Sequence, residues 1–131
     1  MSFPFDPTQD LIVVPAAVTN PEGDVFVVNL VVDTGATNTV INVGVLMAMG
    51  YDPLLATDHF RILTGSGVES VSSVKLRNIT TLGKSRDDFP AISHSLPLHA
   101  GINGMDGVLG LDFFRGHLVT IDFRRGRISL G

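Results

Sequence analysis

The 131-residue sequence contains no cysteine, which excludes disulfide bonds, thiol catalysis and metal sites built from thiolates. It has no apolar run close to the roughly 20 residues that span a bilayer, and its start lacks the basic, apolar and small-residue segments of a signal peptide. A chain without disulfides is also compatible with a reducing compartment. We therefore expect a cytoplasmic protein with no membrane partner.

Positive charge is also scarce. Nine Lys and Arg residues face thirteen Asp and Glu residues, which gives a formal net charge of −4. Proteins that bind nucleic acids or anionic membranes need basic faces, so neither partner is expected. The one basic cluster, Arg124, Arg125 and Arg127, surrounds Gly126 in what the sequence predicts to be a solvated hairpin turn.

The residues that are abundant favour β-structure. Hydrophobic residues make up 44% of the chain and charged residues 17%, with 14 glycines and 7 prolines. This length and composition predict a single domain, residues 1–131, with its own core. Short Val, Ile and Leu runs separated by turn residues predict a mostly β fold.

Local patterns place the expected elements. We expect strands at residues 11–18, 25–32, 60–63, 68–76, 78–82, 118–123 and 127–130. Asn42 is expected to cap a short helix at residues 43–49, which Gly50 ends in a left-handed conformation. A helical turn is expected at residues 111–115, and residues 83–104 are expected to form a loop.

One triplet carries the chemistry. Asp33, Thr34 and Gly35 form an Asp-Thr-Gly sequence between two stretches of β-branched residues. Two carboxylates about 3 Å apart cannot both ionise, so such a pair holds one proton and can act as acid and base on a water. The chain supplies one such Asp. If the triplet is catalytic, the second carboxylate must come from another copy across a two-fold axis.

The neighbours of Asp33 support this hypothesis. Thr34 offers a hydroxyl for a hydrogen bond across the two-fold axis, and Gly35 allows its own N–H to point at the carboxylates. Ala36 cannot donate the hydroxyl hydrogen bond that a serine there could give to an ionised carboxylate. The sequence therefore predicts an activity optimum between weakly acidic and neutral pH.

A second element lies far downstream. Val108 and Leu109 are expected to thread beside the Asp33 loop, with Gly110 turning tightly into a supporting helix. An Asp-Thr-Gly triplet alone is also an ordinary turn sequence, so a structural role for Asp33 stays open. The combination of both elements favours catalysis.

These motifs resemble those of the retropepsin-like aspartic proteases, the single-domain relatives of retroviral proteases. The resemblance covers most of the chain: the first hairpin, residues 31–36, a glycine-tipped hairpin, residues 106–114 and a closing strand pair. It implies an acid-protease fold, which is a closed or partly open β-barrel with one or two short helices. It also implies a homodimer that cleaves peptide or protein substrates without a metal or organic cofactor.

The resemblance also assigns roles to residues. Asp33 would be the catalytic acid and base, Thr34 would lock the dimer, and Gly35 would contact the substrate backbone. The active-site loop would comprise Thr34, Gly35, Ala36 and Thr37, and the flap tip Thr64, Gly65, Ser66 and Gly67. Viral relatives usually carry an acidic residue at the position of Thr37, where it pairs with an arginine of the partner subunit. The C-terminal part of this chain is also longer than in the viral enzymes.

Other chemistries are less well supported. Residues 65–67 could cradle a phosphate, but the downstream lysine of a P-loop is missing. Three aspartates raise the question of a metal site, but Asp106 suits a turn, Asp112 a helix start and Asp122 a strand. The four histidines lack the spacing of metal ligands. We expect no metal site. The predicted function is an aspartic endopeptidase; the alternatives are a peptide-binding or scaffolding dimer of the same fold, and a monomeric barrel in which Asp33 only shapes a turn.

Overall fold

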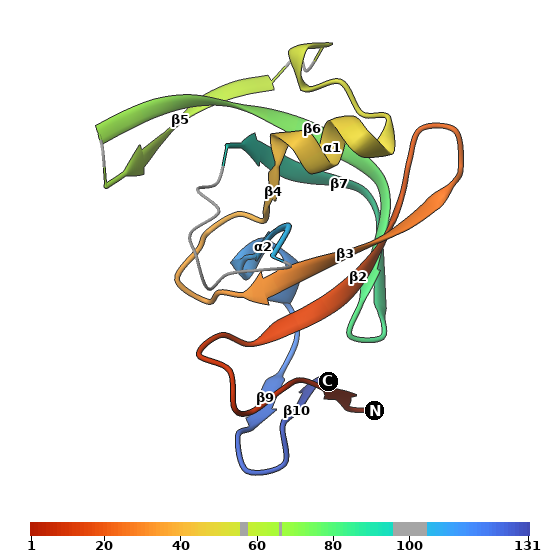
Figure 1. Cartoon of the computed structure of the whole chain (residues 1–131), viewed down its shortest axis with the longest axis vertical. Coiled ribbons are helices and arrows are strands. Elements are labelled where there is room, and N and C mark those ends of the chain that lie inside the picture. The colour runs from red at the N-terminus through yellow and green to blue at the C-terminus, as the bar shows by residue number, and fades with distance from the viewer. Residues whose placement is uncertain (56–57, 66, 96–104) are drawn as a thin grey trace.

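A computed structural model shows a β-barrel with a small second sheet beside it (Figure 1). It describes all residues except 56–57, 66 and 96–104. The strands are β1 (Phe3–Pro4), β2 (Val13–Thr19), β3 (Val25–Val32), β4 (Val40–Asn42), β5 (Asp58–Thr64), β6 (Gly67–Thr81), β7 (Lys84–His94), β8 (Gly107–Leu109), β9 (Val119–Asp122) and β10 (Arg127–Leu130). The helices are α1 (Val43–Met49) and α2 (Leu111–Phe114), and η1 (Pro53–Leu55) is a 3₁₀ turn.

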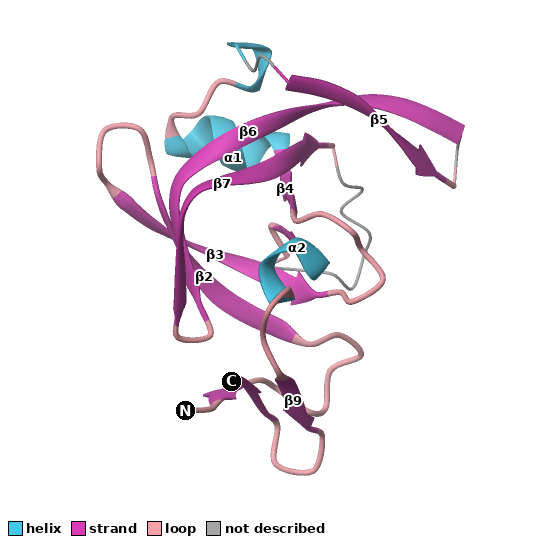
Figure 2. Cartoon of the chain, turned by 180° about the vertical axis from the view of Figure 1, so that it is seen from behind, coloured by secondary structure: helices cyan, strands magenta, loops and turns pink. Residues whose placement is uncertain are grey.

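The larger sheet closes on itself. Its strand order is β2-β3-β8-β4-β7-β6-β5. An additional pairing between β2 and β6 closes the first six of these strands into a ring. Six strands therefore form a barrel, and β5 extends from it as the outer arm of the β5–β6 hairpin (Figure 2). The expected mostly β barrel with short helices is confirmed.

Strand β8 occupies a narrow place between two neighbours. It runs parallel to β3, with Leu30 opposite Gly107, and antiparallel to β4, with Ile41 opposite the same glycine. A Cβ built on Gly107 would lie 2.1 Å from the carbonyl oxygen of Val40. Only glycine fits here, because that contact is with backbone.

The core fills the barrel and the space under the helices. On β2 the side chains of Val14, Ala16 and Val18 are buried, and intervening residues face outward, as a strand with one buried face requires. The largest fully buried side chains are those of Phe113, Leu30, Ile41, Leu46, Leu76, Ile79, Leu109 and Ile128. This core draws on the barrel strands, both helices and β10.

Helix α1 has the ends that its sequence predicts. The side chain of Asn42 accepts a hydrogen bond of 2.8 Å from the Gly44 N–H, and Gly50 follows with φ +102°. Both signals act within a few residues, which explains why the helix could be located from sequence.

Two expectations for the middle of the chain are wrong. Residues 78–82 are not a separate strand, because β6 runs without a break through fifteen residues to Thr81. Much of the predicted 83–104 loop is strand β7, which pairs with β6 across a tight turn at Leu82 and Gly83. Both turn residues have positive φ, as short hairpin turns require. The remainder, residues 96–104, lies outside the described residues.

Pro90 contributed to the wrong prediction of a loop at residues 83–104. It lies in β7 opposite Lys75 of β6, whereas β4 pairs with β7 only from Ile92 onward. Within the described residues, no strand pairs with β7 on the β4 side at Pro90. The Ile92 N–H, two residues later, donates to Thr39 on that side, so the nitrogen of Pro90 faces the unpaired side and the missing N–H costs no hydrogen bond to β6.

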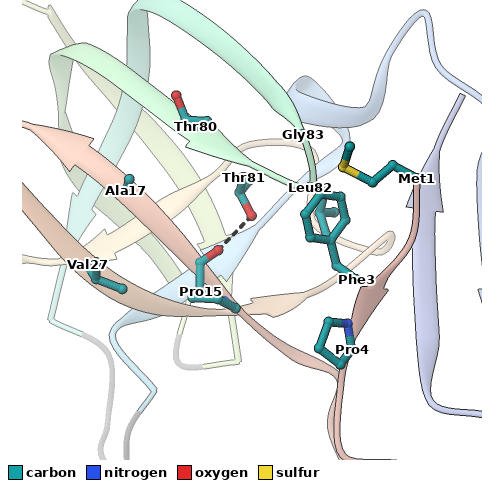
Figure 3. Close-up of a pocket in the computed structure, with 10 residues that line it drawn as sticks. All are labelled: Met1, Phe3, Pro4, Pro15, Ala17, Val27, Thr80, Thr81, Leu82 and Gly83. Atoms are coloured by element: carbon teal, nitrogen blue, oxygen red, sulfur yellow. Dashed lines mark hydrogen bonds between the residues drawn. The ribbon is translucent and has the colours of Figure 1, made fainter.

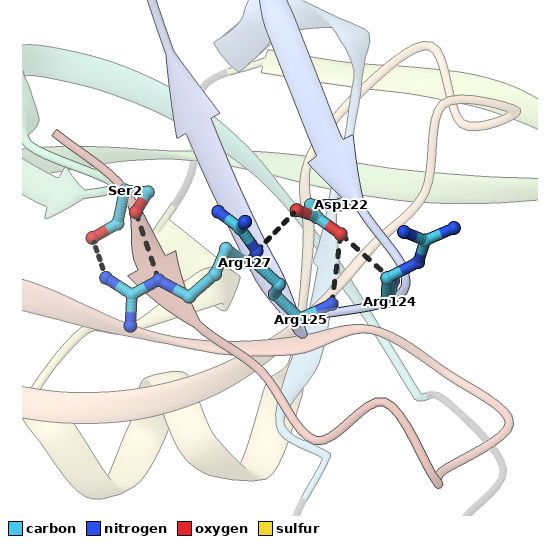
Figure 4. A network of polar contacts seen from close by, with 5 residues as sticks. All are labelled: Ser2, Asp122, Arg124, Arg125 and Arg127. Atoms are coloured by element: carbon cyan, nitrogen blue, oxygen red, sulfur yellow. Dashed lines mark hydrogen bonds and ion pairs between the residues drawn. The ribbon is translucent and has the colours of Figure 1, made fainter.

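The second sheet joins the two ends of the chain in the order β1-β10-β9. Arg127 fastens it by donating to the hydroxyl (3.0 Å) and the carbonyl (2.6 Å) of Ser2 (Figure 4). The Asp122 carboxylate accepts from the N–H groups of Arg124 and Arg125 at 3.0 and 2.9 Å. Arg124 and Arg125 thus lie in the hairpin turn that the sequence predicts, and Arg127 is the first residue of β10.

Tyr51 links two strands at the far end of α1. Its buried hydroxyl donates to the carbonyl of Thr19 (2.6 Å) and accepts from the N–H of Arg77 (2.9 Å). Burial raises the pKa of the Tyr51 phenol above its ordinary value of 10.0. The neutral phenol is therefore the form that the fold stabilises.

We expect Tyr51→Phe to lower the free energy of unfolding by about 1 kcal/mol, because the part-buried Thr19 carbonyl and Arg77 N–H lose the hydroxyl as a partner. The pKa of the Tyr51 phenol is higher in the folded protein than in the unfolded chain. The extra stability that the wild type gains from Tyr51 is therefore complete below the pKa of the unfolded chain, and it is lost as pH rises through the pKa of the folded protein. Urea denaturation at pH 7 and above pH 10 measures both effects. An equal difference between the two proteins at both pH values would contradict this account.

Candidate active site

Asp33 lies directly after β3, at the point where β3 leaves its neighbour β8. Its N–H donates to the carbonyl of Leu109 (3.0 Å), which continues the parallel pairing by one residue. Its Oδ1 accepts a hydrogen bond of 2.9 Å from the Gly35 N–H. Among the described residues, Oδ2 receives no hydrogen bond. The carboxylate is partly exposed, so its second oxygen can meet a water or another chain.

Glycine leaves room for the Asp33 carboxylate at the next turn of this loop. A Cβ built on Gly35 would lie 3.2 Å from Oδ1 of Asp33, tighter than ordinary van der Waals contact. The glycine therefore lets its N–H approach the carboxylate without a side chain in between. This is the geometry that the sequence predicts for Gly35.

The loop after Asp33 wraps closely around Gly110. The carbonyl of Ala36 accepts from the Leu111 N–H (2.8 Å), and that of Thr37 accepts from the Asp112 N–H (3.2 Å). A Cβ on Gly110 would approach the Asn38 carbonyl to 2.6 Å. The backbone of this loop therefore packs directly against Gly110, beneath the N-terminal end of α2.

A buried polar network, missed by the sequence analysis, ties the loop to α2. Thr39 is fully buried, and its hydroxyl donates to Oδ1 of Asp112 (2.7 Å). The same hydroxyl accepts from the Gly110 N–H (3.1 Å), and the Thr39 N–H donates to both Asp112 oxygens at 3.0 Å. The sequence predicts Asp112 at a helix start, and the structure places it in the first turn of α2. No local signal relates it to Thr39, because the two residues are 73 positions apart.

We expect Thr39→Val to lower the free energy of unfolding by about 1 to 3 kcal/mol, because the Gly110 N–H would remain buried without a partner. Thr39→Ser is the matched control: it keeps the hydroxyl and loses one methyl group, at a cost of about 1 kcal/mol. Urea denaturation compares the two variants. Equal stability of the valine and serine variants would show that the network contributes little.

The candidate flap is the tip of the β5–β6 hairpin. Thr64 pairs with Gly67 and Leu63 with Val68, so β5 and β6 form the predicted hairpin. Ser66 lies outside the described residues. The hairpin projects on the side of the barrel where β3 ends (Figures 1 and 2). Leu63 and Val68 are largely exposed there and present apolar surface.

The structure therefore brings most of the predicted site residues together. Gly35 and Ala36 follow Asp33 in one loop, and Leu109 and Gly110 support it from the other side. Val108 lies on β8 between Val31 and Val40. Thr34 and Thr37 are exposed on the same loop. The roles of these residues in catalysis, dimer locking and substrate binding stay predictions.

An apolar pocket of about 470 Å³ lies elsewhere, between β1, β2, β3 and the β6–β7 turn (Figure 3). Phe3, Pro15, Val27 and Leu82 contribute to its walls, and the hydroxyl of Thr81 donates to the Pro15 carbonyl beside it. None of the described residues that line it has an acidic or basic side chain.

Two further searches cover the described part of the chain. No group of three or more His, Asp or Glu side chains there could hold a metal ion. Within the same residues, no helix has the length and hydrophobicity needed to cross a membrane.

The sequence family described as "gag-polyprotein putative aspartyl protease" matches residues 23–116. This match includes Asp33, the β5–β6 hairpin and Gly110, and it spans most of the chain. The chain belongs to this aspartyl protease family. Among curated proteins, none matches the sequence of this family member.

Solved structures show the same fold. The chain is similar to a retropepsin-like aspartic protease from Rickettsia conorii, with a TM-score of 0.70 and 16% identity over 99% of this chain and 88% of that one. It is also similar to the retroviral protease-like domain of Ddi1 from Leishmania major, with a TM-score of 0.58 and 17% identity over 92% of this chain and 94% of that domain. This member of the family thus has the retropepsin-like fold, as the resemblance of its sequence implies.

Proposed function

We propose that this protein is an aspartic endopeptidase whose active site forms between two copies of the chain. The observation that carries the proposal is the Asp33 carboxylate itself. One oxygen is oriented by the Gly35 N–H, and the loop that bears it is held on Gly110 and α2. A carboxylate on a rigid support, with its second oxygen accessible, suits acid-base chemistry.

In the proposed reaction, the two Asp33 side chains share one proton and hold a water between them. The ionised carboxylate removes a proton from the water as its oxygen attacks the peptide carbonyl carbon, and the protonated one donates to the carbonyl oxygen. A proton then passes to the peptide nitrogen, and the carbon–nitrogen bond breaks. These steps need no metal or organic cofactor and no covalent intermediate.

The open edge of the second sheet supports a dimer. Strand β9 is the outer strand of that sheet, and the flanking Leu118 and Phe123 are 71% and 67% exposed. An open strand edge with large apolar neighbours favours pairing with another chain. Thr34 is exposed beside Asp33, where its hydroxyl can form the predicted hydrogen bond across the two-fold axis.

A peptide-binding dimer of low activity is the second candidate. Leu63 and Val68 give the β5–β6 hairpin an exposed apolar surface that could hold a peptide without cleaving it. Thr37 also stands where related viral enzymes usually have an acidic residue that pairs between subunits. The two candidates share a fold and differ in turnover.

Digestion of a mixed peptide library from pH 3 to 8, with mass-spectrometric detection, tests the proposal. We expect cleavage with an optimum between weakly acidic and neutral pH, and a specific activity that rises with protein concentration as dimers form. Sedimentation at the same concentrations measures the dimer directly. A dimer that cleaves no peptide would favour the binding protein, and a chain that stays monomeric at every concentration would overturn the shared active site.

A further inference from the structure

Arg86 reaches from β7 to the C-terminal end of α2. Its Nη2 donates to the carbonyl of Phe113 (2.6 Å) and, at 3.4 Å, to that of Arg115. The guanidinium also lies over the Phe113 ring, 5.1 Å from its centre. One side chain therefore binds the end of this helix through hydrogen bonds and through an aromatic face.

Helix α2 needs such support. It has four residues, no side-chain hydrogen bond at its N-cap, and no basic residue in its last turn. Helices this short are not stable alone, and cations near the last carbonyls stabilise a C-terminus. Arg86 supplies that cation from strand β7. Phe89, three residues further along β7, packs edge-on against Phe113, with ring centres 5.8 Å apart.

The other end of α2 holds the Asp33 loop. The N–H groups of Leu111 and Asp112 donate to the loop carbonyls of Ala36 and Thr37, and the Asp112 carboxylate binds Thr39. The helix is a single turn, so a shift at its C-terminal end is transmitted to these hydrogen bonds. Arg86 is thus connected to the catalytic loop without belonging to it.

We propose that Arg86 is a positioning residue for Asp33: by fixing the end of α2, it sets the place of the loop that carries the carboxylate. This inference rests on the proposed protease function. The guanidinium does not touch substrate. Small displacements of a catalytic group slow a reaction much more than they weaken binding of an extended substrate, so Arg86 should affect kcat more than KM.

The geometry also distinguishes arginine from lysine. The planar guanidinium donates to the carbonyls through Nη2 while its flat face covers the Phe113 ring, whereas an ammonium is a compact, strongly hydrated charge with no flat face to lie on the ring. Among the described residues, no acceptor binds the buried Nε of Arg86. Its hold on α2 therefore comes from Nη2 and the ring contact, and lysine should replace it only in part.

The experiment compares Arg86→Met, which keeps the aliphatic stem, with Arg86→Lys and with Tyr51→Phe. Tyr51→Phe loses two part-buried hydrogen bonds away from the Asp33 loop and controls for lower stability. At a temperature where all variants are folded, we expect Arg86→Met to lower kcat by about tenfold or more with KM changed less than about twofold. Arg86→Lys should recover part of the loss, and Tyr51→Phe should keep the wild-type kcat.

Hydrogen exchange gives a readout that needs no activity. In Arg86→Met, the amides of Leu111 and Asp112 should exchange faster than in wild type, whereas in Tyr51→Phe they should not. Unchanged exchange, or a wild-type kcat in Arg86→Met, would overturn the positioning role. Faster exchange in a protein whose wild type cleaves nothing would instead refute the protease function and leave the contact between Arg86 and the loop established. If Arg86→Met does not fold, Arg86→Lys supplies the same comparisons.

Discussion

Asp33→Asn is expected to abolish peptide cleavage, with kcat/KM lower by about 10³-fold or more. In the proposed symmetric site the change removes both carboxylates, so neither acid nor base would remain. Asparagine has the same shape, and its side-chain oxygen can still accept the Gly35 N–H. The fold and the dimer should therefore survive, as sedimentation and thermal unfolding would show.

Mixtures of the two proteins test whether chains share the site. When wild type and Asp33→Asn are mixed equally and allowed to exchange partners, only about one quarter of dimers carry two carboxylates. Cleavage per total protein should then fall to about a quarter of the wild-type value, whereas independent sites would give half. Full activity of Asp33→Asn would mean that Asp33 only shapes a turn.

Gly107→Ala is expected to have the largest effect on stability, lowering the free energy of unfolding by about 3 kcal/mol or more. The new Cβ would lie 2.1 Å from the Val40 carbonyl oxygen and 3.0 Å from the Cα of Ile41. Neither atom belongs to a flexible side chain, so β4 would have to move away from β8. Such a loss is a large part of the total stability of a small domain.

Gly65→Ala is the matched control for stability. A Cβ at Gly65 meets no atom within 4 Å, so the same chemical change should alter unfolding by less than about 0.5 kcal/mol. Circular dichroism during urea denaturation measures both variants. If Gly107→Ala were as stable as Gly65→Ala, strand β8 would not have the close neighbours described.

Elements with local signals could be predicted from sequence. Strand β3 has the predicted bounds because its β-branched run ends at the Asp-Thr-Gly triplet. Helix α1 also has the predicted bounds, because Asn42 and Gly50 act on backbone groups within a few residues of each end of the helix. The tip of the β5–β6 hairpin was visible for the same reason, from its closely spaced glycines.

Strand β7 could not be recognised in this way. Its first half is polar and exposed on alternate residues, and Pro90 suits the strand because no described strand pairs with β7 on the β4 side there. The turn before it uses Leu82 with φ +52°, a conformation that the sequence does not indicate for leucine. Strand β7 forms because it pairs with β6, and neither its polar first half nor the turn at Leu82 reveals that pairing in the sequence.

The candidate site shows the same division. Asp33, Gly35 and Gly110 were identifiable because their residue types suit a carboxylate loop and close backbone contact. Asp112 and Arg86 were not, since each acts on a partner far away in the sequence. Their importance depends on side-chain directions that no short motif encodes.

The support of the Asp33 loop also determines when it can be assembled. Thr39 and Asp112 are separated by 73 positions, and the Asp106 side chain reaches the Asn29 N–H across 77. On the ribosome, the aspartate is therefore made long before the residues that hold it. A nascent chain that has not yet emerged past α2 lacks the groups that hold the Asp33 loop, so the order of synthesis delays the assembly of the candidate site.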